Sequence, residues 1–178
     1  MPASSATDPV AEAGGAPLLI LTLGLRDEIF AVETERVHEV LDLPHVTDVP
    51  NSRSFVTGLI NVRGKVVPVA DLRARFGMEK GVATPTTRIV VMDVLIDGEP
   101  TLVGALADKV YGVTEVAAAS LEEAPRVGMT WRSEFVRAIG KRGDEFIIII
   151  DIDRVFASEE TAYVGPSSDS PESPRPAV

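Results

Sequence analysis

An internal repeat of β-forming residues constrains the fold of this chain more than any other feature. The stretch from Gly58 to Phe76, GLINVRGKVVPVADLRARF, contains two apolar runs joined at an Arg-Gly turn and followed by a short charged segment. A related pattern returns from Phe135 to Phe156 as FVRAIGKRGDEFIIIIDIDRVF. The residues that match at a spacing of 80 positions are Phe55 and Phe135, Val56 and Val136, Leu59 and Ile139, Val67 and Ile147, Val69 and Ile149, Asp71 and Asp151, Leu72 and Ile152, and Phe76 and Phe156. This regular spacing predicts two related β units.

The repeat changes spacing at two places. Arg63-Gly64 aligns with Arg142-Gly143 at a spacing of 79, so we expect a one-residue slip in the turn, because loops absorb insertions that strands do not. Upstream, a spacing of 76 aligns Ala31 with Ala107, Val37 with Val113, Glu39 with Glu115 and Val40 with Val116. The alternative is that two unrelated β units share this apolar spacing.

The hydrophobic pattern predicts a mainly β protein with short helices. Short strands are predicted at 18–24 and 28–32, and a second hairpin at 88–97 and 101–108 turns at Asp97-Gly98, a strong hairpin signal. About five short strands per unit suit a small closed barrel, which removes exposed sheet edges. Pro68 is predicted at an edge or a bulge because it cannot donate to a ladder. The run Ile147–Ile152 is apolar on both alternating faces, which predicts a strand covered on both sides. Short helices are predicted at 72–76 and 153–160.

Composition places the chain among globular proteins and defines its ends. Its 178 residues, 45% of them hydrophobic, are sufficient for a packed core. We expect residues 1–17 to be a disordered tail, residues 18–160 to form the folded body with a second unit beginning near residue 88, and residues 161–178 to be a disordered, acidic Pro/Ser-rich tail. The formal net charge of −10 disfavours nucleic-acid binding, which needs a basic face.

Several kinds of chemistry are disfavoured by the residues present. The chain has no cysteine, and its two histidines, His38 and His45, are too few for a histidine-built metal centre, so we expect no cofactor and no metal. No apolar stretch approaches the ~20 residues that span a bilayer, and no leader is recognisable, which predicts a cytoplasmic protein without membrane insertion. Asp151 and Asp153 form a potential acid pair, but at a helix start capping explains them better. Trp131 is interpreted as a core plug, with a contact anchor as the alternative.

The turn of the first copy contains the best candidate for recognition. Gly64 supplies the positive φ that a tight turn needs, and Asn61 can bond its own backbone, so turn structure explains both residues. Arg63 has no such explanation. A turn places its guanidinium at the rim of the barrel, where it is either a solvated surface arginine or a bidentate ligand for a partner carboxylate.

Four segments together resemble the CheW family of bacterial chemotaxis coupling proteins. They are the pattern F-x-V-x-x-x-x-V-x-E-V from Phe30 to Val40, then FVTGLINVRGKVVPVADLRARF, then VYGVTEV, then FVRAIGKRGDEFIIIIDIDRVF. The resemblance covers about 140 of the 178 residues, and G-x-x-N-x-R-G-x-x-x-P-x-x-D-L is its most specific segment. It implies two five-stranded, Src-homology-3-like barrels, no catalytic activity, and an adaptor that bridges chemoreceptors to the histidine kinase CheA in signalling arrays.

The resemblance also implies particular binding residues and partners. Val37, Glu39, Asn61, Arg63 and Gly64 match family positions for receptor or kinase contact, whereas we assign Gly58, Pro68 and Asp71 to backbone geometry and packing. The implied partners are the cytoplasmic tip of a chemoreceptor, the regulatory domain of a CheA-type kinase, and other CheW-like domains. His38, Lys65 and the acidic tail depart from the family pattern and leave the pathway open, either flagellar or another chemosensory system. The alternatives are a small-ligand-binding barrel or minor hydrolase acting at Asp151 and Asp153, and an adaptor for something other than a receptor.

Overall fold

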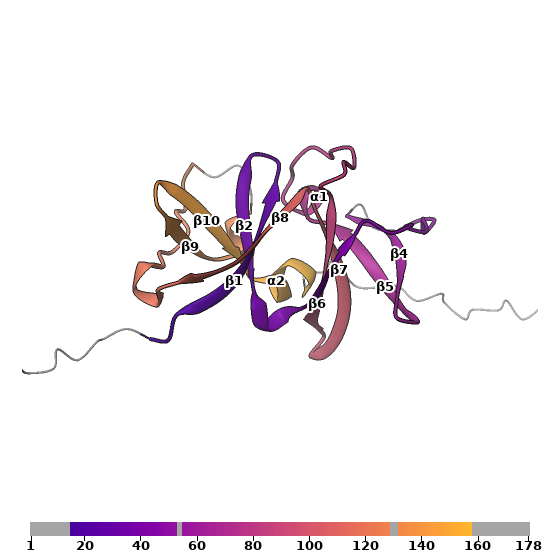
Figure 1. Cartoon of the computed structure of the whole chain (residues 1–178), viewed down its shortest axis with the longest axis horizontal. Helices are drawn as coiled ribbons and strands as arrows, with labels where there is room; N and C mark the ends of the chain where they lie inside the picture. Colours follow the sequence, from indigo (N-terminus) through magenta and orange to yellow (C-terminus); the bar gives the residue numbers. More distant parts are fainter. Residues whose placement is uncertain (1–14, 53–54, 129–131, 158–178) are drawn as a thin grey trace, which may run out of the picture.

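Two five-stranded sheets form the body of the protein, with short helices between and beside them (Figure 1). The structure is a computed structural model that describes residues 15–52, 55–128 and 132–157, so Trp131 and nearly all of both predicted tails lie outside the described residues. Sheet A has the order β8-β1-β2-β10-β9 and sheet B the order β3-β6-β7-β5-β4. The predicted mainly β fold with two five-stranded units is confirmed.

The bounds of the elements are as follows. Sheet A contains β1 (Leu18–Leu25), β2 (Glu28–Glu33), β8 (Lys109–Val116), β9 (Val136–Arg142) and β10 (Glu145–Ile150). Sheet B contains β3 (Val37–Asp42), β4 (Val56–Val62), β5 (Lys65–Asp71), β6 (Arg88–Ile96) and β7 (Glu99–Ala107). The helices are α1 (Leu72–Arg75) and α2 (Ile152–Ala157), with 3-10 turns η1 (Thr34–Arg36), η2 (Ala118–Ser120) and η3 (Ser133–Phe135).

The two sheets exchange hairpins. The β1–β2 hairpin joins the C-terminal strands β8 to β10, whereas the β6–β7 hairpin joins β3 to β5. Within the described residues the chain therefore passes from sheet A to sheet B through η1, and back from sheet B to sheet A at Asp108, between β7 and β8. Figure 1 shows the two sheets as two lobes, with α2 between them.

Each sheet is also joined across its open side. After β3, Thr47 forms two backbone hydrogen bonds of 2.8 Å with Leu59 of β4, the opposite edge of sheet B. After β8, Glu122 pairs in the same way with Ile139 of β9, with bonds of 2.9 and 2.7 Å. We call these two contacts the seam of sheet B and the seam of sheet A. They pair the backbone groups that an edge strand leaves free.

In the part of the chain that the structure describes, the core consists of three clusters. One lies on the inner face of sheet B, around Val67, Val69 and Ile89, and one on the inner face of sheet A, around Ile147 and Ile149. The largest cluster contains residues of both sheets and both helices, including Ile148 and Ile150. Alternate residues of β10 thus enter two different clusters, which confirms the prediction of a strand covered on both faces.

The matching phenylalanines of the repeat meet in the shared cluster. Phe76 packs edge-on against Phe135 with a centroid distance of 5.9 Å, and Phe55 packs edge-on against Phe156 at 6.3 Å. The guanidinium of the buried Arg75 lies over both Phe55 and Phe135, at 5.0 and 4.6 Å from their centroids. The phenylalanine at the C-terminal end of each helix therefore packs on the phenylalanine that precedes β4 or β9 of the other copy, as a pseudo-twofold arrangement requires.

One detail of the predicted repeat is wrong. Val62 pairs with Lys65 around the turn residues Arg63 and Gly64, and Arg142 pairs with Glu145 around residues 143 and 144. The spacing of 80 therefore continues through the turn without a slip, and Arg63 corresponds to Gly143, not to Arg142. A two-residue loop fixes the hairpin register whatever its residues are, so the shared Arg-Gly letters are a coincidence of sequence.

The helix starts and the strand proline also refine the predictions. The Oδ1 atom of Asp71 accepts from the backbone of Arg73 at 3.0 Å, and that of Asp151 accepts from Arg154 at 3.1 Å, so these aspartates cap α1 and α2. Asp153 was assigned to capping as well, which is wrong because it lies inside α2 and bonds elsewhere. Pro68 was predicted at an edge or a bulge, but it lies on β5, an inner strand of sheet B, opposite Leu59 of β4, and the register shift of β4 and β5 is between Val56 and Gly58. A proline fits there because the pairing of β5 with β7 begins only at the next residue, Val69.

Candidate partner-binding surface

The β4–β5 turn presents Arg63 at the end of a rigid hairpin. Arg63 and Gly64 have φ values of 51° and 85°, the left-handed pair of a tight two-residue hairpin turn. The Oδ1 atom of Asn61 accepts the backbone N–H of Gly64 at 2.8 Å, as its position before the turn predicts. Asn61 and Gly64 thus shape the turn, and Arg63 is its projecting side chain, 83% exposed.

Arg63 reaches across the seam of sheet B to Glu39. Its Nη2 atom lies 3.4 Å from Oε2 of Glu39, whose side chain is 26% exposed. Because β3 and β4 are the two opposite edges of sheet B, this ion pair spans the same opening as the Thr47–Leu59 bridge. A pair this exposed contributes about 0–1 kcal/mol to stability, so most of the capacity of the guanidinium stays available to a partner.

Gly58 explains how the seam can close. A Cβ atom on Gly58 would lie 2.3 Å from the carbonyl oxygen of Thr47 and 2.7 Å from Cγ1 of Val46. The segment after β3 therefore passes directly over Gly58, where no other residue fits without displacement. This is the physical reason for the assignment of Gly58 to backbone geometry.

Val37 is separated from the other predicted residues by an irregularity in β3. Val37 pairs with Met92 and Glu39 with Val91, so the register shifts between them. Met92 belongs to the shared cluster and Val91 to the cluster inside sheet B. Directly opposite residues share a face of a sheet, so Val37 packs on the shared cluster, as its partner Met92 does. Glu39 lies on the other face, with Val91, and from there it reaches Arg63 across the seam.

The bulge residue itself makes a contact that the sequence did not predict. Nε2 of His38 contacts Oδ2 of Asp93 on β6, with side chains 51% and 46% exposed. Four of the five predicted residues, namely Glu39, Asn61, Arg63 and Gly64, thus gather at the seam of sheet B, where its two edge strands meet, and Val37 begins one of these strands. Asp93 had no sequence signal, because its partner lies 55 positions away.

The Asp151 and Asp153 end of the molecule contains a hollow of about 280 Å³ that is lined by strands of sheet A, by η1 and by the start of α2. Its charged lining is extensively paired: Arg36 with Asp153, and Arg137 with Glu33. Asp151 lies 3.3 Å from Nε of Arg154. Among the described residues, no group of three or more His, Asp or Glu side chains has an arrangement that would hold a metal ion. Within that same part of the chain, no helix is both long and apolar enough to cross a membrane.

Comparisons with known proteins agree over nearly the whole described chain. The family model described as a CheW-like domain matches residues 19–160. The chemotaxis protein CheW of Klebsiella aerogenes is 33% identical over 153 residues, which cover 86% of this chain and 89% of that protein. The chemotaxis protein CheW of Rhizobium meliloti is 31% identical over 147 residues, or 83% of this chain and 91% of that protein. The crystal structure of the scaffolding protein TtCheW from Thermoanaerobacter tengcongensis superposes with a TM-score of 0.73 at 31% identity and covers 86% of this chain and 96% of that one.

Proposed function

Because the chain belongs to the CheW-like family, we propose that it is a non-enzymatic adaptor of a chemosensory pathway. It couples the cytoplasmic tips of chemoreceptors to a CheA-type histidine kinase and is recruited with them into signalling arrays. The family match over residues 19–160 is the observation that carries this proposal, because it includes both sheets and the surface around Arg63.

The geometry around the seam of sheet B supports a role in docking. Arg63 projects from a turn that is held by Asn61, and Nη2 of its guanidinium contacts the carboxylate of Glu39. This contact orients the planar group while its remaining N–H donors face solvent. A pre-oriented arginine loses less side-chain entropy on binding a carboxylate, which is the arrangement expected of an anchor at an interface.

Binding of the Arg63→Ala variant to receptor and kinase fragments tests the proposal. We expect its affinity to fall roughly 30-fold, the effect of an anchor residue at a protein interface. Arg142→Ala is the matched control, because Arg142 flanks the corresponding turn of sheet A and also lies 3.4 Å from a carboxylate, that of Glu145. Glu39→Gln removes the steering charge without removing the guanidinium, so we expect a smaller loss.

Two results would contradict this assignment. Wild-type affinity of a folded Arg63→Ala variant for both partners would remove Arg63 from the docking surface. An equal loss in Arg142→Ala would indicate a general effect of surface charge. If the unmodified chain bound neither receptor nor kinase fragments, the adaptor function itself would fail.

A further inference from the structure

Both passages of the chain between the sheets are held by an ion pair to a short helix. The first passage is η1, which ends at Arg36 immediately before β3. The second is Asp108, between β7 and β8. Helix α1 contacts the second passage through Arg73, and helix α2 contacts the first through Asp153. These two contacts are called here the Arg73 latch and the Asp153 latch.

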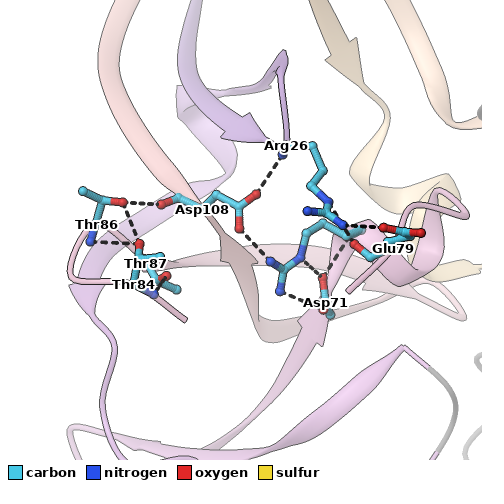
Figure 2. Close-up of polar contacts among 8 residues, drawn as sticks. Arg26, Asp71, Glu79, Thr84, Thr86, Thr87 and Asp108 are labelled. Atoms are coloured by element: carbon cyan, nitrogen blue, oxygen red, sulfur yellow. Dashed lines mark hydrogen bonds and ion pairs between the residues drawn. The ribbon is translucent and has the colours of Figure 1, made fainter. Parts of the chain in front are cut away.

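The Arg73 latch joins several elements (Figure 2), and it combines a buried guanidinium with the carboxylate of Asp108, which is 29% exposed. Nε and Nη2 of Arg73 bind Asp71 in bidentate fashion at 2.9 and 3.0 Å, and Nη1 binds Oδ1 of Asp108 at 2.7 Å. The other oxygen of Asp108 accepts the backbone N–H of Arg26, in the β1–β2 turn of sheet A, at 2.7 Å. The side chain of Arg73 is 4% exposed, and its hydrogen bonds to Asp71 raise its pKa above the ordinary value despite burial.

A second set of contacts encloses this latch. The side chain of Arg26 extends back to Glu79, with Nη2 at 3.1 Å from Oε2 and Nε at 3.2 Å from the carbonyl oxygen. A Cβ atom on Gly81 would lie 2.5 Å from Nη1 of Arg73, so the loop after α1 passes closely over the guanidinium. Sheet A, α1 and this loop are thus tied together around one buried cation.

The Asp153 latch has fewer hydrogen bonds than the Arg73 latch, and both of its side chains are partly exposed to solvent. Asp153 pairs with Arg36, and its Oδ1 also accepts the backbone N–H of Leu95, near the end of β6, at 2.8 Å. The side chains of Arg36 and Asp153 are 28% and 34% exposed, and both line the 280 Å³ hollow beside sheet A. Solvent and salt reach this pair, so its attraction is weaker than that of a buried pair.

The two latches occupy corresponding places with opposite polarity. Arg73 and Asp153 are 80 positions apart and are each the second residue of their helix. In α1 this position is a cation that binds an anionic passage, and in α2 it is an anion that binds a cationic passage. The pseudo-symmetry of the fold therefore supplies two equivalent attachment points. One is built on a buried guanidinium, and the other is partly exposed at both side chains.

We propose that the Arg73 latch is the fixed pivot between the two sheets and the Asp153 latch is a releasable clasp that sets the angle between them. Release of the clasp removes the polar contacts of α2 with Leu95 of β6 and with Arg36, which directly precedes Val37 and β3, while Ile152, Val155 and Phe156 stay packed in the shared cluster. The angle between the sheets and the position of the start of β3 then change together. This inference concerns the free protein and does not depend on the proposed adaptor function.

Spin-label distance measurements on the full chain test the clasp. Because the chain contains no cysteine, Val66→Cys on β5 and Val113→Cys on β8 place one label on each sheet at side chains that are 70% and 62% exposed. In this background, Asp153→Asn removes the charge but keeps an acceptor for Leu95, and Arg36→Gln removes the same ion pair from the other side. Glu145→Gln, which removes an exposed ion pair within sheet A, is the matched control.

We expect Asp153→Asn and Arg36→Gln to broaden the distance distribution and Glu145→Gln to leave it unchanged. Salt near 1 M, where the Debye length is about 3 Å, should broaden the distribution of the unmodified clasp without further effect on Asp153→Asn. Amide exchange at Leu95 should accelerate roughly tenfold in Asp153→Ala relative to Asp153→Asn, because only the alanine removes the acceptor. An unchanged distribution in Asp153→Asn and Arg36→Gln, or equal broadening in Glu145→Gln, would overturn the proposal.

Discussion

Substitution of Gly58 by alanine tests whether the close passage of the chain over β4 controls the seam of sheet B. The added methyl group would lie 2.3 Å from a backbone oxygen of Thr47, a contact that a side-chain rotation cannot relieve. If the segment stays in place, overpacking costs about 1–3 kcal/mol. If it moves away, the two 2.8 Å hydrogen bonds between Thr47 and Leu59 are lost, at about 1 kcal/mol each. Either route lowers the free energy of unfolding by about 2 kcal/mol.

A comparison of urea unfolding between the Gly58→Ala and Gly140→Ala variants measures this cost. Gly140 lies on β9 of sheet A, and a Cβ atom there would meet Cγ1 of Val116 at 3.4 Å, an ordinary contact. Both substitutions reduce the entropy of the unfolded chain by the same 0.4–1 kcal/mol, so the difference between them isolates the clash. We expect Gly58→Ala to lower the urea midpoint by roughly 1 M relative to Gly140→Ala. Equal midpoints for the two variants would refute the explanation of Gly58 by close passage.

Three further substitutions probe the interior and the exposed ion pair. Arg73→Met leaves the buried carboxylate of Asp71 without its cation, so the free energy of unfolding should fall by about 3–5 kcal/mol. Adding Asp71→Asn removes the unpaired charge and should recover part of this loss. No recovery would contradict the buried-charge argument. Phe135→Ala should cost about 3–5 kcal/mol in a thermal melt, against less than ~0.5 kcal/mol for the 59% exposed Phe146→Ala. Arg63→Ala should change stability by less than ~1 kcal/mol, and a larger change would make it a structural residue.

Local chemistry in the sequence was sufficient to predict much of the fold. The Asp97-Gly98 turn has φ values of 53° and 82° and joins two nine-residue strands, as a hairpin signal of this kind requires. The apolar run of β10 predicted burial on both faces because no single-faced strand tolerates it. The repeated phenylalanines predicted two related units, and their contacts in the shared cluster follow from that relation.

Contacts between distant residues were not predictable in the same way. The exchange of hairpins depends on which strands pair in space. The same sequence repeat fits two arrangements, one in which each hairpin stays with the strands that follow it and one in which the two hairpins are exchanged. Asp153 looked like a capping residue because a sequence shows only its neighbours in α2, whereas its partners Arg36 and Leu95 are 117 and 58 positions away. The shared Arg-Gly letters gave the wrong register for the turn, because the two-residue loop length sets the register and not the identity of the loop residues.

The two seams show how one fold yields an asymmetric molecule. In sheet A, the seam is pinned by Lys141 and Glu122 at 3.2 Å, and Lys141 lies within β9 at the position that corresponds to Asn61. In sheet B, Asn61 instead holds the turn, and the cation moves two residues further to Arg63, which raises the exposure of the cationic side chain from 51% to 83%. Lys141, on a strand, pairs with Glu122 across the seam of sheet A. Arg63, at the tip of a turn, pairs with Glu39 in the same way and also extends into solvent, where a partner can contact it. We therefore expect partners to recognise the seam of sheet B rather than its counterpart.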